Sequence, residues 1–383
     1  MKNKFGKVVG IIALFLVGFL LYQKRQHDMI AKPRFIIEST SPVRSMSSRA
    51  LLFESAIIPQ PLYLPAAHSS SFTMLANDDL LAFWFAGTKE GQPDVKIWHS
   101  TYHNGKWDMA TSLVDPQMIA KANHRYVIKV GNPVIYRAAN GVLHLFVVSV
   151  SIGGWSGSAL NHLQSQDNGL HWTSPERIVI SPFFNISTLV RTSAVGLSDG
   201  GFYLPVYHEF IRKYPELLRF DADGNFIQQI RITNKNKMLQ PSLVPVGSLN
   251  AWTFFRNSAN DSESRVLYTS QTTDGGMHWS DPEPTNLTNP DASIAAVSLN
   301  DGRMLMVYND ISRAHLWLAI SYNGTEWHPI YQLEDKPGEE FSYPSIQVNG
   351  NLIDILYTNN RQNIKHVRFN RNWLNEEINH AKH

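Results

Sequence analysis

Side chains that could perform chemistry are scattered along the chain, each beside a short apolar run. Arg256 ends the aromatic segment WTFFR, and Arg313 precedes the segment HLWLAIS. A planar guanidinium in such a place can bind a carboxylate through two parallel hydrogen bonds, or it can form a salt bridge at a strand end. Tyr343, in the segment FSYPSI, is either a ligand-binding hydroxyl or a packed tyrosine whose hydroxyl is satisfied.

Five further polar residues are candidates for the same site. His68 is followed by three serines, which leave space beside the imidazole, so it is either a base or sugar hydrogen-bond donor, or a structural histidine. Asp94, in the segment GTKEGQPD, is either an acid/base or a solvated loop carboxylate. Gln240 is either a sugar hydrogen-bonding group or a turn residue. Arg361 follows the apolar run LIDILYTNN, and Glu209 follows GFYLPVY.

Composition and missing motifs exclude several classes of function. The 383 residues contain no cysteine, which excludes a disulfide scaffold and a cysteine nucleophile. Lys and Arg total 34 against 32 for Asp and Glu, so no strongly basic surface points to nucleic acid. No His-rich metal motif, phosphate-binding loop, dinucleotide fingerprint or G-x-S-x-G elbow occurs. We therefore expect no metal and no cofactor.

The local pattern predicts an all-β fold. Apolar runs of five to eight residues follow turn pairs rich in Asn, Asp and Gly, which is typical of strands in hairpins. The clearest runs are Leu80–Phe85, Val142–Ser149, Gly201–Tyr207, Arg303–Tyr308 and Leu352–Tyr357. No long segment with helical periodicity follows the N-terminal apolar run.

A second unit repeats about every 50 residues and predicts a six-bladed β-propeller over residues 52–383. Its pattern is S/T-x-D-x-G-x-x-W. The clean copies are Ser165–Trp172 and Thr272–Trp279, and the degenerate ones are Ser100–Trp107, Asp221–Phe226, Ser321–Trp327 and Phe369–Trp373. The Asp can accept turn N–H groups, the Gly supplies a positive φ, and the Trp can pack between blades. Asp167 and Asp274 are therefore expected to hold turns rather than to catalyse.

The clean copies resemble the Asp-box, or BNR repeat, of the sialidase (neuraminidase) superfamily, and residues 60–370 share its pattern. The segments GTKEGQPD, QPSL, NPDAS, FSYP and NRQNIKHV resemble a bacterial neuraminidase-like branch. The resemblance implies that Asp94 is the acid/base, Tyr343 the nucleophile, and Arg256 and Arg313 part of a carboxylate clamp. A tyrosine nucleophile is the sialidase exception among glycosidases.

Two positions depart from the family pattern. His68 stands where the family has its first clamp arginine, and Gln240 stands where it has the glutamate that activates the tyrosine. An amide cannot take the phenol proton, and Glu209 is the candidate substitute. We predict a sialidase-like hydrolase acting on terminal acidic sugars of a glycan. The alternatives are a non-catalytic carbohydrate-binding propeller and a uronic-acid-directed glycosidase or lyase that uses His68.

The N-terminus predicts export. Basic residues precede and follow the apolar run 8–22, which is short for a membrane span of about 20 residues, and no small-residue cleavage site follows. We interpret residues 1–25 as an uncleaved signal-anchor in the membrane and residues 26–51 as a tether, with the propeller periplasmic or extracellular. The alternative is secretion after signal cleavage. The glycine-rich segment Gly153–Gly157 is either a loop that permits approach to a ligand or a plain flexible loop, and its Trp155 either stacks on a sugar or packs in the core.

Overall fold

The apolar runs fold into six antiparallel sheets arranged as the blades of a propeller. The computed structural model describes residues 32–37, 50–181, 185–259 and 265–382. In five blades the strands follow one another along the chain, from an inner strand at the centre to an outer strand at the rim. The runs predicted from the sequence are the second strands of five blades, β3, β8, β13, β21 and β25.

The strands of the first three blades have these bounds: β2 (Ala66–Met74), β3 (Leu80–Gly87), β4 (Lys96–His103), β5 (Lys106–Trp107) and β6 (Thr111–Val114); β7 (Lys129–Arg137), β8 (Leu143–Val150), β9 (Ser158–Ser165) and β10 (Glu176–Arg177); β11 (Leu189–Val190), β12 (Val195–Gly196), β13 (Phe202–Glu209), β14 (Lys213–Phe220) and β15 (Phe226–Arg231). Two short strands, β11 and β12, share the inner edge of the third blade, since both pair with β13.

The remaining blades have these bounds: β16 (Met238–Pro245), β17 (Ala251–Asn257), β18 (Val266–Thr272) and β19 (Glu283–Thr288); β20 (Ala295–Ser298), β21 (Met304–Asn309), β22 (His315–Ser321) and β23 (Trp327–Asp335); β24 (Phe341–Asn349), β25 (Leu352–Asn359), β26 (Asn363–Asn370) and β1 (Phe53–Ile57).

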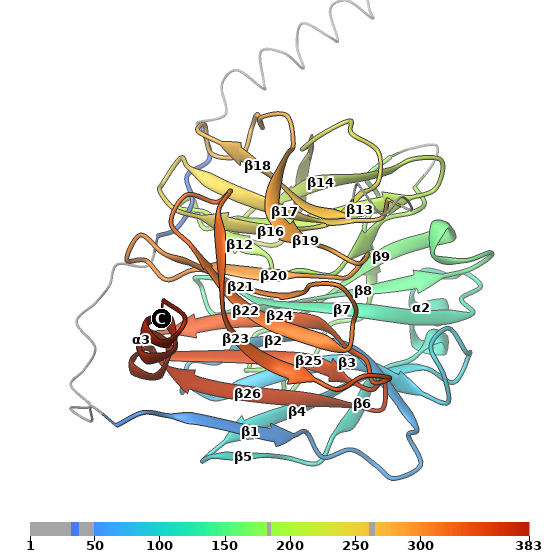
Figure 1. Cartoon of the computed structure of the whole chain (residues 1–383). Coiled ribbons are helices and arrows are strands. Elements are labelled where there is room, and N and C mark those ends of the chain that lie inside the picture. Colours follow the sequence, from blue (N-terminus) through green and yellow to red (C-terminus); the bar gives the residue numbers. More distant parts are fainter. Residues whose placement is uncertain (1–31, 38–49, 182–184, 260–264, 383) are drawn as a thin grey trace, which may run out of the picture. The chain divides into compact units, whose positions relative to one another are not determined.

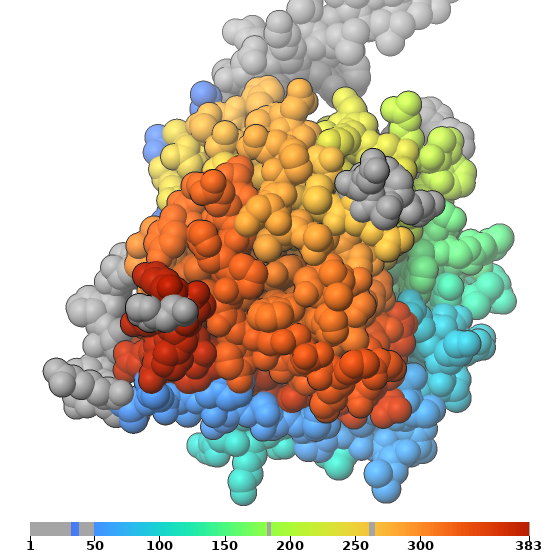
Figure 2. Space-filling model, in the orientation of Figure 1, coloured from blue at the N-terminus to red at the C-terminus, as the bar shows by residue number. Residues whose placement is uncertain are grey.

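The sixth blade closes the ring with a strand from the other end of the chain. β1 pairs antiparallel with β26, with Phe53 opposite Phe369. In Figure 1 the blue β1 lies beside the red β26, and Figure 2 shows the blue strand along the lower edge of the orange and red blades. Phe53 also packs on Trp373, with ring centroids 4.5 Å apart. The closure therefore rests on backbone pairing and on an aromatic cluster.

Six apolar clusters fill the spaces between neighbouring blades. Trp327 illustrates the packing, since it is fully buried against Phe254 of the preceding blade, with ring centroids 5.2 Å apart in an edge-on arrangement. The Asp-boxes place such tryptophans. In the copy at Ser165–Trp172, Asp167 accepts the backbone N–H of His171 at 2.9 Å, and the indole of Trp172 donates to the Gly169 carbonyl at 3.0 Å. The prediction of a structural role is confirmed at this turn.

The structure corrects the sequence reading at the C-terminus and adds a second helix. α3 (Arg371–His380) begins where the sixth repeat was predicted, and the Asn370 side chain caps it by accepting the Trp373 N–H. Phe369–Trp373 is therefore the end of β26 and a capped helix start, not an Asp-box turn. α2 (Pro116–Asn123) is capped by Asp115 and lies between β6 and β7. A short 3₁₀ turn, η1 (Trp155–Gly157), precedes β9.

Part of the predicted tether is docked on the propeller. Phe35 is 2% exposed, packs against Tyr203 and forms an isolated bridge with Leu197. Its backbone N–H donates to the Ser248 carbonyl at 2.8 Å. Among the described residues, no helix has the length and apolarity needed to cross a membrane. The predicted signal-anchor, residues 1–25, lies outside the described residues.

Candidate functional site

The inner edge of every blade carries a residue in the left-handed backbone region, at its start or just before it. These residues are Ser69 (φ 60°), Asn132 (φ 36°), Ser187 (φ 63°), Gln240 (φ 48°), Asp291 (φ 57°) and Tyr343 (φ 55°), and Lys237 (φ 73°) is a second one in the fourth blade. In four blades the strand register shifts at this residue, as in a β-bulge. A left-handed backbone conformation costs free energy for a non-glycine residue. At functional sites, such a residue in a β-bulge changes the direction in which side chains point. Repetition in six blades points these residues toward one end of the central axis.

Tyr343 lies at the middle of the site. Arg256 of β17 donates to its phenol oxygen at 3.1 Å. The guanidinium carbons of Arg191 and Arg313 lie 5.2 and 5.8 Å from its ring centroid, and the His68 ring centroid lies 4.2 Å away. Blades one, three, four and five therefore bring side chains to this tyrosine of blade six.

His68 is buried beside this positive charge. It is 3% exposed, and neither ring nitrogen has a hydrogen-bond partner among the described residues. Burial lowers the pKa of His68 well below its usual range, and the charges of the four arginines at the site, Arg361, Arg191, Arg313 and Arg256, lower the pKa further. The imidazole is therefore neutral at neutral pH and keeps a free acceptor nitrogen.

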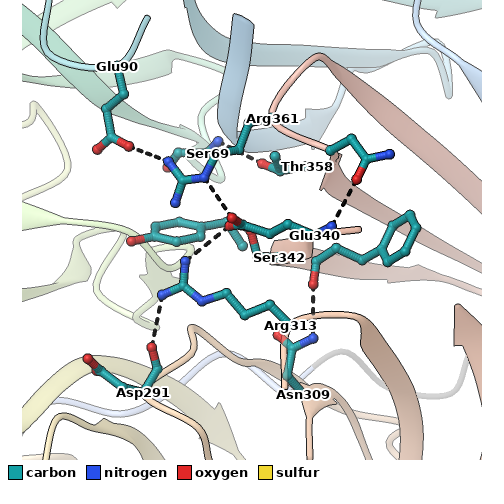
Figure 3. A network of polar contacts seen from close by, with 12 residues as sticks. Ser69, Glu90, Asp291, Asn309, Arg313, Glu340, Ser342, Thr358 and Arg361 are labelled. Atoms are coloured by element: carbon teal, nitrogen blue, oxygen red, sulfur yellow. Dashed lines mark hydrogen bonds and ion pairs between the residues drawn. The ribbon is translucent and has the colours of Figure 1, made fainter. Parts of the chain in front are cut away.

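Carboxylates hold the outer arginines in place, as Figure 3 shows. Glu340 accepts from Arg313 at 3.1 Å and from Arg361 at 2.7 Å. Arg361 also pairs with Glu90 of the β3–β4 loop at 2.5 Å. Burial alone would raise the pKa of Glu340, but the hydrogen bonds from Arg361 and Ser342 and the charge of Arg313 hold it below its usual value. Glu340 is therefore an ionised bridge between two clamp arginines.

Two further arginines have different partners. Arg256 pairs with Asp291 at 2.7 Å, and although burial opposes it, Tyr343 and Asp291 raise the pKa of this arginine. Arg191 is fully buried and donates to the carbonyl oxygens of Ser70 and Pro344, at 3.0 and 2.7 Å. Burial lowers the pKa of Arg191 to about 10. Arg191 still carries a positive charge at neutral pH, and within the described part of the chain no carboxylate pairs with it.

A second tyrosine adjoins the first. Tyr207 of β13 is buried, and its oxygen receives hydrogen bonds from Gln240 at 3.2 Å and from Asn132 at 3.4 Å. Burial raises the pKa of Tyr207, and the charges of Tyr343 and Glu209 raise it further. Gln240, predicted to stand in place of an activating glutamate, thus contacts Tyr207 rather than Tyr343.

Several buried polar atoms at the site have no partner within the described part of the chain. Besides the His68 nitrogens, these are the hydroxyls of Ser69 and Ser70 and the amide oxygen of Gln240. Buried polar atoms are normally hydrogen-bonded, so such a group needs an explanation. Ser69 and Ser70 are fully buried, so the structure as it stands does not expose these two hydroxyls to a ligand.

Six of the eight sequence-predicted residues fall in or beside this cluster: His68, Gln240, Arg256, Arg313, Tyr343 and Arg361. Asp94 does not reach it. Its two carboxylate oxygens accept from the backbone and hydroxyl of Thr88, both at 2.8 Å, and the residue is exposed. Glu209 ends β13, where its backbone N–H donates to the Ser187 hydroxyl, and the structure shows no contact with Tyr343.

A cavity of about 290 Å³ adjoins the cluster, with His68, Glu90 and Arg361 among its lining residues. A larger cavity of about 460 Å³ is lined by the other ends of the inner strands, such as Met74, Pro245 and Val348. Arg191 of the site also lines this larger cavity, but none of the sequence-predicted residues does, whereas His68 and Arg361 line the smaller one. Among the described residues, no group of three or more His, Asp or Glu side chains is placed to hold a metal ion.

Comparison with known families agrees with this architecture. Residues 78–355 match the family described as BNR repeat-like domain. The chain belongs to the BNR repeat-like family. None of the curated protein sequences shows significant similarity to it.

Solved structures share the fold of this BNR propeller. A protein of unknown function from Dyadobacter fermentans superposes with a TM-score of 0.66 at 14% identity, covering 83% of this chain and 98% of that one. The Hadza microbial sialidase Hz136 superposes with a TM-score of 0.65 at 15% identity, covering 79% of this chain and 65% of that one. The intramolecular trans-sialidase from Ruminococcus gnavus superposes with a TM-score of 0.64 at 13% identity, covering 80% of this chain and 95% of that one. The six-bladed, sialidase-like architecture is confirmed, and these identities show the fold alone.

Sequence reasoning missed several residues of the BNR site, including Arg191, Tyr207, Glu90 and Glu340. One available signal was the proline that follows the left-handed residue in Asn132-Pro133, Gln240-Pro241 and Tyr343-Pro344. Each pair lies near the start of an inner strand, so this signal could have located Asn132, but it does not mark Arg191, Tyr207, Glu90 or Glu340. Arg191 has no such signal, because its burial depends on two other blades.

Proposed function

We propose that this BNR propeller is a sialidase-type glycoside hydrolase that releases a terminal acidic sugar from a glycan, with Tyr343 as nucleophile. The observation that carries the proposal is the hydrogen bond from Arg256 to the Tyr343 oxygen, together with the two further guanidinium groups against its ring. Positive charge beside a phenol stabilises its phenolate, the form that attacks an anomeric carbon. The same charge attracts an anionic sugar.

The substrate carboxylate would bind the arginines on the open side of the cluster. The guanidinium groups of Arg256 and Arg313 each donate two hydrogen bonds to described residues, and a guanidinium has five N–H donors. Asp291 fixes the orientation of the Arg256 guanidinium, and Glu340 fixes that of the Arg313 guanidinium. A carboxylate that enters therefore meets donors that need little reorganisation.

His68 is the proposed acceptor of the Tyr343 proton, since the amide of Gln240 cannot act as a base. The arginine charges that lower its pKa would be partly offset by the bound carboxylate, so substrate makes His68 a stronger base. The phenolate oxygen forms a bond to the anomeric carbon as the glycosidic C–O bond breaks. The leaving oxygen takes a proton from a carboxylic acid of the β3–β4 loop, proposed to be Asp94. In the second step that carboxylate removes a proton from water, whose oxygen displaces Tyr343, and His68 returns the phenol proton.

The test is turnover of chromogenic acidic glycosides by the full chain. A fluorinated acidic sugar that slows the second step should leave a covalent adduct on a Tyr343 peptide, detected by mass spectrometry. Release of the leaving group without any adduct on Tyr343, or unchanged turnover in Tyr343→Phe, would show that Tyr343 is not the nucleophile.

A second candidate reaction is elimination from a uronic-acid chain with His68 as base. Its support is the buried, neutral imidazole with two unpartnered nitrogens beside an arginine cluster. An eliminase leaves a carbon–carbon double bond conjugated to the carboxylate, which absorbs in the ultraviolet, whereas a hydrolase does not. Binding of acidic glycans without either product would indicate a non-catalytic binding propeller.

A further inference from the structure

The cavity beside His68 is lined by residues of the first two blades and by Arg361 of the sixth. Its walls come from the start of β2, the β3–β4 loop, the start of β7 and the η1 turn. Its residues include Ala66, Phe85, Lys89, Lys129 and Trp155. The volume of about 290 Å³ is at the lower end of the ~300–1,000 Å³ typical of small-molecule sites. Because His68 and Arg361 also line it, the cavity adjoins the proposed cleavage site.

Trp155 is held in this cavity by a glycine. A Cβ added to Gly131 would lie 2.6 Å from the Trp155 ring, so only glycine lets the indole lie on β7. The Lys129 amine lies 4.5 Å from the ring centroid. It also reaches the opposite wall, since it would be 3.5 Å from a Cβ on Gly91. An aromatic face and an amine thus lie next to each other over one cavity.

The charges in this cavity are not balanced. Glu90 is paired with Arg361. Within the described part of the chain, Lys89 and Lys129 have no carboxylate partner. By contrast, Lys96, on the neighbouring strand β4, lies 3.8 Å from Asp115. The cavity therefore presents two unpaired amines beside an indole and an unpartnered imidazole.

We propose that this cavity binds an anionic substituent, a sulfate or a carboxylate, on the sugar next to the one that is cleaved. The two amines offer point charges for the anion, and the indole holds one of them, that of Lys129, in place through a cation–π contact. The inference rests on the proposed function and names its substrate class: a glycan with a second negative charge beside its terminal acidic sugar.

The experiment uses the full chain and thio-linked acidic disaccharides that resist hydrolysis. Three ligands differ only in the second sugar, which is neutral, sulfated or carboxylated. Isothermal titration compares the wild type with the double variant Lys89→Gln/Lys129→Gln and with the control Lys96→Gln. We expect a charged second sugar to bind the wild type and the control about tenfold tighter than the neutral one. This difference in affinity between charged and neutral second sugars should disappear in the double variant. In the wild type, the size of the difference for the sulfated and for the carboxylated ligand identifies the preferred anion.

Equal binding of all three ligands to the wild type would overturn the anionic subsite and leave the proposed function standing. A preference for charge that persists in the double variant would also overturn it, because the lysines would not be its source. Failure of every acidic disaccharide to bind would overturn the proposed function and this inference together.

Discussion

Arg256 donates a hydrogen bond to the phenol oxygen of Tyr343 at 3.1 Å, although 87 positions separate the two residues in the chain. They belong to the fourth and sixth blades, so the bond joins two blades that are not neighbours in the ring. Arg256 is fixed from its other side by Asp291 of the fifth blade. Residues from three blades therefore position the Arg256 guanidinium against the Tyr343 phenol.

The first prediction separates the two tyrosines. Tyr343→Phe removes the oxygen that Arg256 contacts, and we expect kcat/KM on an acidic glycoside to fall about 10³-fold or more, with little change in thermal stability. Tyr207→Phe is the matched variant. It leaves the amides of Gln240 and Asn132 without a partner, and it should cost about 1–3 kcal/mol of unfolding free energy. A larger loss of turnover in Tyr207→Phe would assign the nucleophile to Tyr207.

The second prediction concerns the two carboxylates of the β3–β4 loop. Asp94, proposed as acid/base, accepts two bonds from Thr88 in this structure, whereas Glu90 pairs with Arg361 and lines the cavity. If Asp94 turns to the leaving group, Asp94→Asn should lower turnover of substrates with poor leaving groups about 10²-fold or more, and activated ones much less. Glu90→Gln should instead raise KM, because it removes one of the two carboxylates that hold Arg361 and leaves only Glu340. The reverse pattern would assign the acid to Glu90.

The third prediction uses a buried histidine pair far from any proposed chemistry. His144 and His162 share a hydrogen bond of 3.0 Å. Burial lowers their pKa values to about 4 and about 3. Below about pH 6.5 the unfolded chain gains protons at these positions that the folded chain does not, so stability falls as the pH drops toward 4. Above pH 6.5 both states are neutral and the pair adds no pH dependence.

The measurement is urea unfolding between pH 4.5 and 7.5. His162→Leu removes one buried imidazole and should flatten the acid side of the stability curve. His328→Leu, at an exposed position on β23, is the control and should leave the curve unchanged. An equally steep acid side in His162→Leu would mean that other groups dominate the acid destabilisation.

Much of the fold follows from local patterns, and much of the site does not. Turn pairs and apolar runs predict the second strands, such as β8 and β25, because these strands are buried on both faces. The spacing of about 50 residues gives the number of blades, although the sixth predicted copy is a strand end and helix start rather than an Asp-box turn. The left-handed conformation of Tyr343 is not visible in local propensity, because non-glycine residues rarely adopt it. The partners of Arg191 lie in blades distant in sequence, so only the closed ring brings them together.

The fourth prediction tests that closure. β1 supplies the outer strand of the sixth blade, and Phe53 packs on Trp373 and Phe369. A chain beginning at Lys32 keeps both β1 and the buried Phe35, and it should give one cooperative thermal transition. A chain beginning at Ile58 lacks β1 and exposes the edge of β26 and an aromatic cluster. We expect it to aggregate or to melt well below the longer chain, as measured by circular dichroism and size-exclusion chromatography.

A control beginning at Ala50 removes the docked Phe35 but keeps β1, so it separates the two contributions. Equal melting of the chains that begin at Lys32 and Ile58 would show that β1 does not hold the ring closed.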